Sequence, residues 1–195
     1  MKASIWILSF CGCSVLTANQ AAAAGSVTVN SAPRSFSVVP PHSWIQQPTT
    51  TGSSRVKFSA PAGTPTAECA VIVKEFPSLK NQPQSVLDRQ MTEPTSATEL
   101  AAQMSARFNN VRILRTGLAS VSGYPAQLVN ARYSVGTPAG EVWSRVFTTT
   151  SATTPGLVWT ITCGALGKTA EEAEKGYSYW QSEIVRFPTN LKILY

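Results

Sequence analysis

Four consecutive strand-like segments constrain the fold of this chain more than any other feature of its sequence. In each segment, either apolar and polar residues alternate or β-branched residues are frequent. Short turns that contain glycine separate the segments. Strands joined by short turns pair as antiparallel hairpins. The sequence therefore predicts an antiparallel sheet built from residues 111–118, 126–135, 141–149 and 157–165.

Three further strands are predicted before this run, at residues 35–39, 55–60 and 68–76. The third has a nearly continuous apolar centre over residues 69–73, which is typical of a strand buried on both faces. Residues 46–54 are polar and predict a loop between the first two strands. The whole sheet is expected to contain about six to seven strands, within the usual size range.

Helical spacing marks two regions of the chain. Residues 83–108 predict two short helices or one kinked helix, interrupted at Pro94 and restarted by a capping box, Ser96-x-x-Glu99. The C-terminal helix starts at a second capping box, Thr169-x-x-Glu172, and ends at Pro188. Apolar residues recur along it at steps of four, three, four and three, which predicts a stripe buried against the sheet rather than a partner-binding face. The stripe is Ala173, Tyr177, Trp180, Ile184 and Phe187.

The first 24 residues are typical of a secretory signal peptide. Lys2 precedes an apolar stretch over residues 3–16, and residues 21–24 are four alanines followed by Gly25. The apolar stretch is shorter than the roughly 20 residues that span a bilayer. A positive start, a short apolar middle and small residues at the end predict cleavage near Ala24-Gly25.

A lipid-anchored form is disfavoured because the bulky Phe10 stands directly before Cys11, where a small residue is usual. No second apolar run of spanning length follows, so no transmembrane segment is expected in the mature chain. The mature protein is expected to be periplasmic or secreted. Residues 25–34 are then expected to form a flexible leader, and residues 35–195 a single domain.

Cysteine usage supports the same compartment. Cys11 and Cys13 leave with the signal peptide, so that Cys69 and Cys163 remain. Two cysteines in an oxidising compartment favour a disulfide, which would tie the early sheet to the late one and add roughly 4 kcal/mol of stability. A reactive thiol or a metal pair is the alternative, but no Cys-x-x-Cys spacing or histidine neighbour supports it.

The chain carries little raw material for catalysis. A Ser-His-Asp site would need His42 and Asp88, the single histidine and the single aspartate, and no Gly-x-Ser-x-Gly motif precedes a helix. Paired carboxylates would have to come from Glu68, Glu75, Glu141 or the acids of the last helix, and the strand glutamates are better explained as charges at strand ends or edges. One histidine without an acidic cluster predicts neither a metal site nor a cofactor.

Two segments resemble a known family. Residues 36–41 (FSVVPP) with Trp44 resemble the F-S-I-x-x-P-x-G-W opening of Mog1/PsbP-like domains, although His42 and Ser43 stand where a glycine is usual. Residues 123–126 (GYPA), followed by an alternating strand with Tyr133, resemble the G-x-P-A…Y hairpin of that family.

The C-terminal region extends the resemblance. The last strand and the helix from Trp180 to Phe187 resemble the F…I-L-x-S-F ending, so that the similarity spans about residues 35–190. It implies an α+β fold in which helices flank an antiparallel sheet, an α/β/α sandwich. Members of this fold act chiefly in binding or in assisting assembly, and they offer no catalytic residue to carry over to this sequence.

Basic and aromatic residues on the predicted strands form a candidate binding patch. In a meander of hairpins they could converge and bind an acidic protein, a phosphate-bearing lipid or a glycan. The alternative is that they are solvated residues at strand ends. The formal net charge of +6 is too mild to indicate nucleic acid, and export argues against such a partner. The residues are Arg112, Arg115, Arg132, Arg145 and Trp143, with Tyr133 beside them.

Three functions are compatible with these patterns. The first is an exported non-catalytic binding or accessory protein of the bacterial envelope, which contacts a protein or envelope component through a sheet edge, residues 46–54 and the arginine-bearing strands. The second is a periplasmic carrier of a small apolar ligand held between helix and sheet beside Trp44, Trp159 and Trp180. The third is a hydrolase with an unrecognised site.

Overall fold

The computed structural model describes residues 25–30, 34–49 and 54–194. Within these residues, ten strands and three α-helices follow one another along the chain. They are β1 (Val27–Val29), β2 (Phe36–Val38), β3 (Ile45–Gln47), β4 (Ser54–Ser59), β5 (Ala67–Glu75), α1 (Gln84–Thr92), α2 (Ala97–Ser105), β6 (Asn109–Val121), β7 (Tyr124–Thr137), β8 (Gly140–Thr153), β9 (Leu157–Gly167), α3 (Ala170–Arg186) and β10 (Leu191–Ile193).

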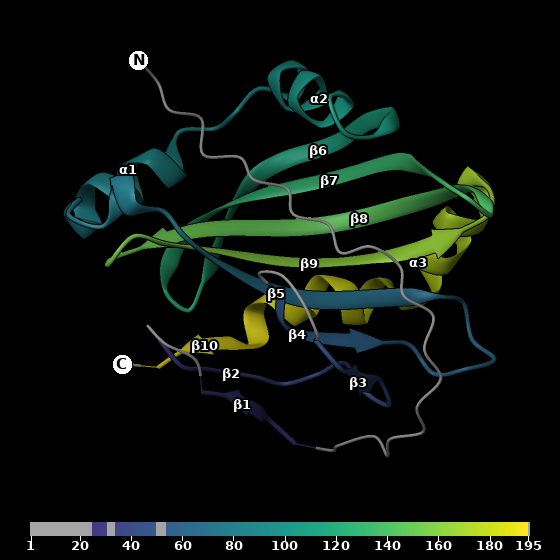
Figure 1. Ribbon diagram of the computed structural model, residues 1–195, viewed down its shortest axis with the longest axis horizontal. Helices are drawn as coiled ribbons and strands as arrows, with labels where there is room; N and C mark the ends of the chain where they lie inside the picture. Colours follow the sequence, from purple (N-terminus) through teal and green to yellow (C-terminus); the bar gives the residue numbers. More distant parts are fainter. Residues whose placement is uncertain (1–24, 31–33, 50–53, 195) are drawn as a thin grey trace.

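Seven strands form one antiparallel sheet in the order β3-β4-β5-β9-β8-β7-β6, and β1, β2 and β10 form a small second sheet (Figure 1). The four predicted hairpin strands are β6 to β9, and each pairs with the next. Ser122 and Gly123 both have positive φ in the two-residue turn between β6 and β7, a conformation that matches the twist of a hairpin. The predicted α+β fold with an antiparallel sheet is confirmed.

Helices cover both faces of the large sheet. Side chains alternate along each strand, and those of Trp159, Ile161 and Cys163 pack in the same core as α3. Val158, on the opposite face of β9, packs with α1, while α2 packs with Val129 and its neighbours on β7. In Figure 1, α1 and α2 lie near one side of the sheet and α3 runs along β9. We call the two faces the α3 face and the α1–α2 face.

The helix α3 forms as its sequence predicts. The hydroxyl of Thr169 accepts a hydrogen bond from the backbone N–H of Glu172 at 3.1 Å, which caps the first turn. Its apolar stripe is buried in the core. Gly176 allows close contact with β9, because a Cβ atom there would lie 3.1 Å from that of Ala165.

The short helices α1 and α2 are separate elements. Pro94 lies between them, and the hydroxyl of Ser96 accepts from the backbone N–H of Glu99 to start α2. Leu87 of α1 and Leu100 of α2 are buried, each in its own cluster on the sheet. Of the two predictions for this region, two short helices is correct.

Tryptophans fill the core on the α3 face. Trp44, Trp159 and Trp180 are at most 9% exposed, and Trp44 packs edge-on against Trp180 with ring centroids 5.3 Å apart. Trp159 donates a hydrogen bond from Nε1 to Thr153 Oγ1 at 3.0 Å and packs edge-on against Phe36. The space predicted for an apolar ligand beside these three side chains is therefore occupied by protein, and that placement is wrong.

Three short strands differ from the sequence prediction. Val27–Val29 pairs with β2 although residues 25–34 predict only a leader, and Ile45–Gln47 pairs with β4 although residues 46–54 predict a loop. Leu191–Ile193 pairs with the other side of β2. Each has only three residues, too few to show a period of two, so its pairing is set by the neighbouring strand.

Cys69 and Cys163 form a disulfide, as the sequence predicts. They stand directly opposite each other on the neighbouring strands β5 and β9, with their Cα atoms 4.1 Å apart. The bond therefore joins two strands within one sheet, rather than an early sheet to a late one. Both cysteines are 1% exposed.

Candidate functional site

Three of the four predicted arginines stand in one row across the sheet. Arg112 on β6 is opposite Arg132 on β7, and Arg132 is opposite Arg145 on β8. Arg115 is opposite Asn130, in a neighbouring row. Directly opposed residues on antiparallel strands point to the same face. Arg145 is opposite Ala165, which packs in the core with α3, so the row lies on the α3 face.

Arg145 is buried and holds α3 against the sheet. Its Nε donates to Glu174 Oε2 at 2.9 Å, and Nη1 donates to Asn130 Oδ1. Its guanidinium lies over the ring of Tyr177, 4.1 Å from the centroid. Burial raises the pKa of Tyr177, although the positive charge of Arg145 acts in the opposite direction. Arg145 is 7% exposed, so its contacts are internal to the fold.

The remaining residues form a surface, which we call the arginine patch: Arg112, Arg115, Arg132 and Trp143. Arg112 and Arg115 are exposed, and the half-buried Arg132 lies 5.9 Å from the centroid of the Trp143 ring. No acid among the described residues forms an ion pair with these three arginines. The patch extends to β6, an outer strand of the sheet.

The residues considered for catalysis lie apart. His42 is in the turn before β3, where its backbone N–H donates to Glu183 of α3 at 3.4 Å. Asp88 lies on α1, across the sheet, and accepts a hydrogen bond from Gln84 at 2.8 Å. Of the strand glutamates, Glu68 lies on the α1–α2 face, whereas Glu141 accepts a hydrogen bond from the hydroxyl of Ser134, two positions after Arg132 on β7. The side chains of His42, Asp88, Glu68 and Glu141 therefore do not converge on one site in the described residues.

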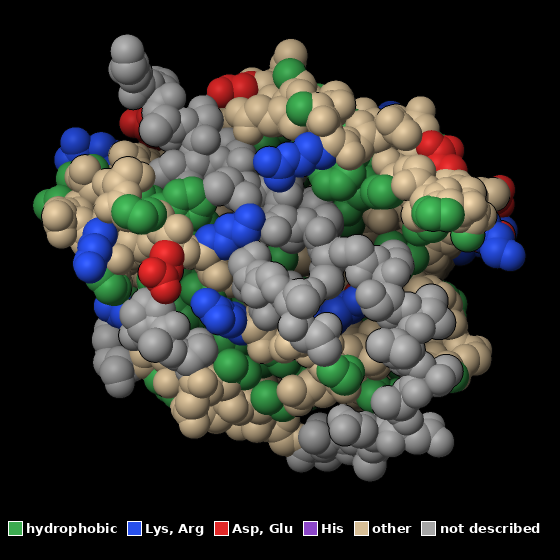
Figure 2. Space-filling view, viewed as in Figure 1, with side chains coloured by type: hydrophobic (Ala, Val, Ile, Leu, Met, Phe, Trp, Pro, Cys, Tyr) green, Lys and Arg blue, Asp and Glu red, His purple; other side chains and the backbone are tan. Residues whose placement is uncertain are grey.

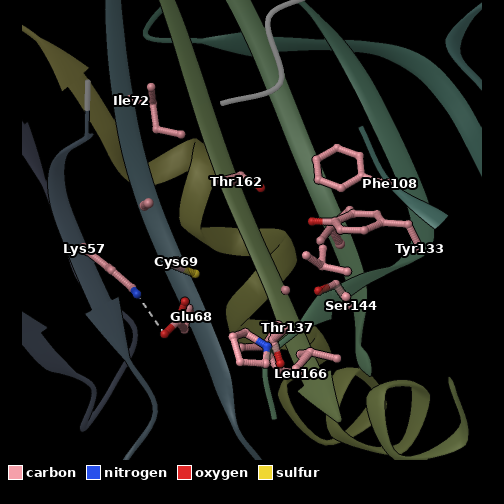
Figure 3. Close-up of a pocket in the computed structure, with 17 residues that line it drawn as sticks. Lys57, Glu68, Cys69, Ile72, Phe108, Tyr133, Thr137, Ser144, Thr162 and Leu166 are labelled. Carbon is pink, nitrogen blue, oxygen red and sulfur yellow. Dashed lines mark ion pairs between the residues drawn. The ribbon is translucent and has the colours of Figure 1, made fainter. Parts of the chain in front are cut away.

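A groove that the sequence did not predict lies on the α1–α2 face. Its volume is about 410 Å³, and strands β5, β9, β8 and β7 supply its floor and walls (Figure 3). The lining is mainly apolar. It includes Ala70, Ile72, Phe108, Tyr133, Val146 and Leu166.

Small side chains create the groove. Ala70 on β5 and Thr162 and Gly164 on β9 lie in the middle of the sheet, outside the clusters that pack with α1 and α2. The Thr162 hydroxyl is hydrogen-bonded to that of Thr148 at 2.8 Å. Because these side chains are short, they leave space above the sheet. The hydroxyl of Thr162 already has a hydrogen-bond partner within the sheet, so it does not need one from a ligand. The sequence signal was Ala70 on one strand and Thr162 and Gly164 at alternate positions of another, and it is meaningful only once the strand order is known.

One ion pair stands at the wall of the groove. Lys57 Nζ lies 2.8 Å from Glu68 Oε1, and both side chains are mostly buried (Figure 3). Among the described residues, no group of three His, Cys, Asp or Glu side chains is placed to hold a metal ion. The groove combines an apolar floor with one charged pair and a few hydroxyl groups, a composition that is common in small-molecule sites.

Comparison with solved structures relates this architecture to known proteins. The solution structure of cyanobacterial PsbP from Synechocystis sp. PCC 6803 matches with a TM-score of 0.55 at 13% identity, over 92% of this chain and 99% of that one. The chain has a PsbP-like fold. At this identity the likeness extends to the fold and no further. The sequence resemblance to Mog1/PsbP-like domains is confirmed at the level of the fold.

A second protein shares the PsbP-like fold. LpqN of Mycobacterium tuberculosis, described as involved in cell envelope biogenesis, matches with a TM-score of 0.51 at 12% identity, over 88% of this chain and 91% of that one. No protein-family model matches the sequence, and a search of curated proteins also finds no match. In the described part of the chain, no helix is long and apolar enough to cross a membrane.

Proposed function

We propose that this chain is an exported, non-catalytic binding protein of the bacterial envelope that holds an apolar ligand in the groove of the α1–α2 face. The groove itself carries the proposal, because an apolar pocket of about 410 Å³ is within the range of small-molecule sites. The separation of His42 from Asp88 gives no support to a hydrolase of the Ser-His-Asp type.

Export is part of the proposal. Residues 1–24, which lie outside the described residues, have the pattern of a signal peptide, and the strands and helices from β1 to β10 follow as one domain. The Cys69–Cys163 disulfide supports an oxidising compartment. LpqN, with the same fold, is described as acting in envelope biogenesis, which supports the envelope as the place of action.

Filling the groove should abolish ligand binding. Ala70→Phe places an aromatic ring on the groove floor, and we expect it to weaken binding of the neutral apolar probe N-phenyl-1-naphthylamine at least about tenfold, by occupying its volume. Probe fluorescence on the processed protein measures this. Ile72→Phe enlarges a second lining residue and should act in the same direction.

The matched control is Ala102→Phe, the same substitution at an exposed position on α2. It should leave binding of the probe unchanged. If a folded Ala70→Phe or Ile72→Phe protein binds the probe as wild type does, or if wild type does not bind it, the groove is not the ligand site.

A second candidate is an acidic partner protein at the arginine patch. The observation that favours it is three neighbouring arginines without ion pairs among the described residues, beside the outer edge of β6. Unneutralised arginines attract carboxylates and phosphates, most strongly at low salt.

Removing the exposed arginines should release such a partner. Arg112→Ala/Arg115→Ala should reduce the amount of protein that co-purifies from the native envelope at low salt, and raising the salt should release it from wild type. Arg89→Ala/Arg186→Ala removes the same charge from exposed positions on α1 and α3 and is the control. Equal recovery with both double variants would exclude the patch as the contact.

A further inference from the structure

Basic side chains gather at one end of the groove. Ile72 and Phe108 mark this end (Figure 3). Lys74 follows Ile72 by two positions on β5, so that it points to the same face, and it stands opposite Val158, which packs under α1. Arg107 directly precedes Phe108. The groove therefore opens toward Lys74 on one wall and Arg107 on the other.

The two cations are close enough to affect each other. Burial and the positive charge of Arg107 both lower the pKa of Lys74. No acid among the described residues forms an ion pair with Lys74. An anion bound between the two side chains would relieve this repulsion.

A third cation lies beside the same end. Arg55 lies where the register between β4 and β5 shifts, and its neighbour Ser54 is opposite Ile72. It is half-buried, and its Nε is buried without a hydrogen-bond partner among the described residues. A buried donor without a partner is costly, and an anionic ligand would supply the missing acceptor.

The opposite end of the groove is different. Leu166, Val142 and Pro138 line it, and the one acid among the lining residues, Glu68, is already paired with Lys57. In the space-filling view, several Lys and Arg side chains lie toward the middle of the visible face, while others lie, like most Asp and Glu side chains, nearer its outline (Figure 2). The groove is thus apolar along its length and positively charged at one end.

We propose that the ligand is a single-chain amphiphile with an anionic head group, a carboxylate or a phosphate. This inference rests on the proposed function and adds the chemical class and the orientation of the ligand. The head group binds beside Lys74, Arg107 and Arg55. The alkyl chain runs along Val146 toward Leu166.

Matched twelve-carbon ligands test this assignment. Displacement of N-phenyl-1-naphthylamine should require about tenfold less dodecanoate than 1-dodecanol, and dodecyltrimethylammonium should bind more weakly than the alcohol. Dodecyl phosphate, compared with dodecanoate, distinguishes the two head groups. All measurements use the processed protein at low salt and again at high salt, where the preference for the anions should shrink.

Charge removal tests the position of the head group. Lys74→Gln should weaken dodecanoate binding about fivefold or more. The affinity for 1-dodecanol should stay within about twofold of the wild-type value. Adding Arg55→Gln should weaken dodecanoate further without affecting the alcohol. Lys192→Gln, at an exposed position on β10, is the control and should change neither. Unchanged alcohol binding also shows that the variants are folded.

The outcomes separate this inference from the proposed function. Equal affinity for dodecanoate and 1-dodecanol, or equal loss of both in Lys74→Gln, would overturn the anionic head group and leave the apolar groove in place. If none of the ligands displaces the probe, or if the probe itself does not bind, both proposals are wrong.

Discussion

Replacing both Cys69 and Cys163 by alanine should lower the free energy of unfolding by about 4 kcal/mol. The disulfide joins residues 94 positions apart, so that its removal frees a long loop in the unfolded chain and raises the entropy of that state. Both side chains are also buried, and alanine leaves unfilled space where the sulfur atoms were. Urea denaturation followed by tryptophan fluorescence measures the change.

Reduction provides an independent version of this experiment. Wild-type protein unfolded in the presence of a reductant should lose a similar amount of stability, whereas the double alanine variant should be insensitive to the reductant. If the double variant loses less than about 1 kcal/mol, the two strands are held by pairing and packing alone. Alkylation of two free thiols in the native exported protein would contradict both the bond and the proposed compartment.

Trp159→Ala should cost a comparable amount, about 4 kcal/mol. Trp159 is fully buried and packs edge-on against Phe36, so that alanine leaves a cavity the size of an indole ring. The substitution also removes the Nε1–H that donates to the buried hydroxyl of Thr153. Trp159→Phe keeps an aromatic ring but loses this hydrogen bond and should cost less, about 1–2 kcal/mol.

The matched control is Trp143→Ala, because Trp143 is half-buried in the arginine patch. It should cost less than half as much as Trp159→Ala. A loss below about 1 kcal/mol in Trp159→Ala would mean that the core on the α3 face is loosely packed. That result would reopen the tryptophan region as a ligand site. With the groove on the other face, a folded Trp159→Ala protein should still bind the apolar probe.

Local patterns predicted much of this fold. The four hairpin strands follow from alternation and short turns, and α3 follows from a capping box and an apolar stripe. These features depend on residues close together in the sequence. The order of the large sheet does not, because β5 lies between β4 and β9 although residues 76–156 separate β5 from β9. Such pairing depends on the burial of whole faces.

In the candidate site, too, some features could be predicted from the sequence and others could not. That Arg112, Arg132 and Arg145 lie on adjacent strands is visible in the sequence, but the role of Arg145 is not, because its partner Glu174 belongs to α3. The groove was missed because its floor combines Ala70 of β5 with Gly164 of β9, and small residues indicate no cavity until the strands that carry them are neighbours.

The sequence by itself determined the hairpins, the helix caps, the segment with a signal-peptide pattern and the two cysteines available to pair, because each depends on short-range geometry or on composition. Only the tertiary structure decided that the tryptophans fill the core, that the arginine row is split between a structural residue and a surface, and that an apolar groove ends in a cluster of cations. These depend on which distant side chains share a face, and that is fixed when the sheet assembles and its faces are buried.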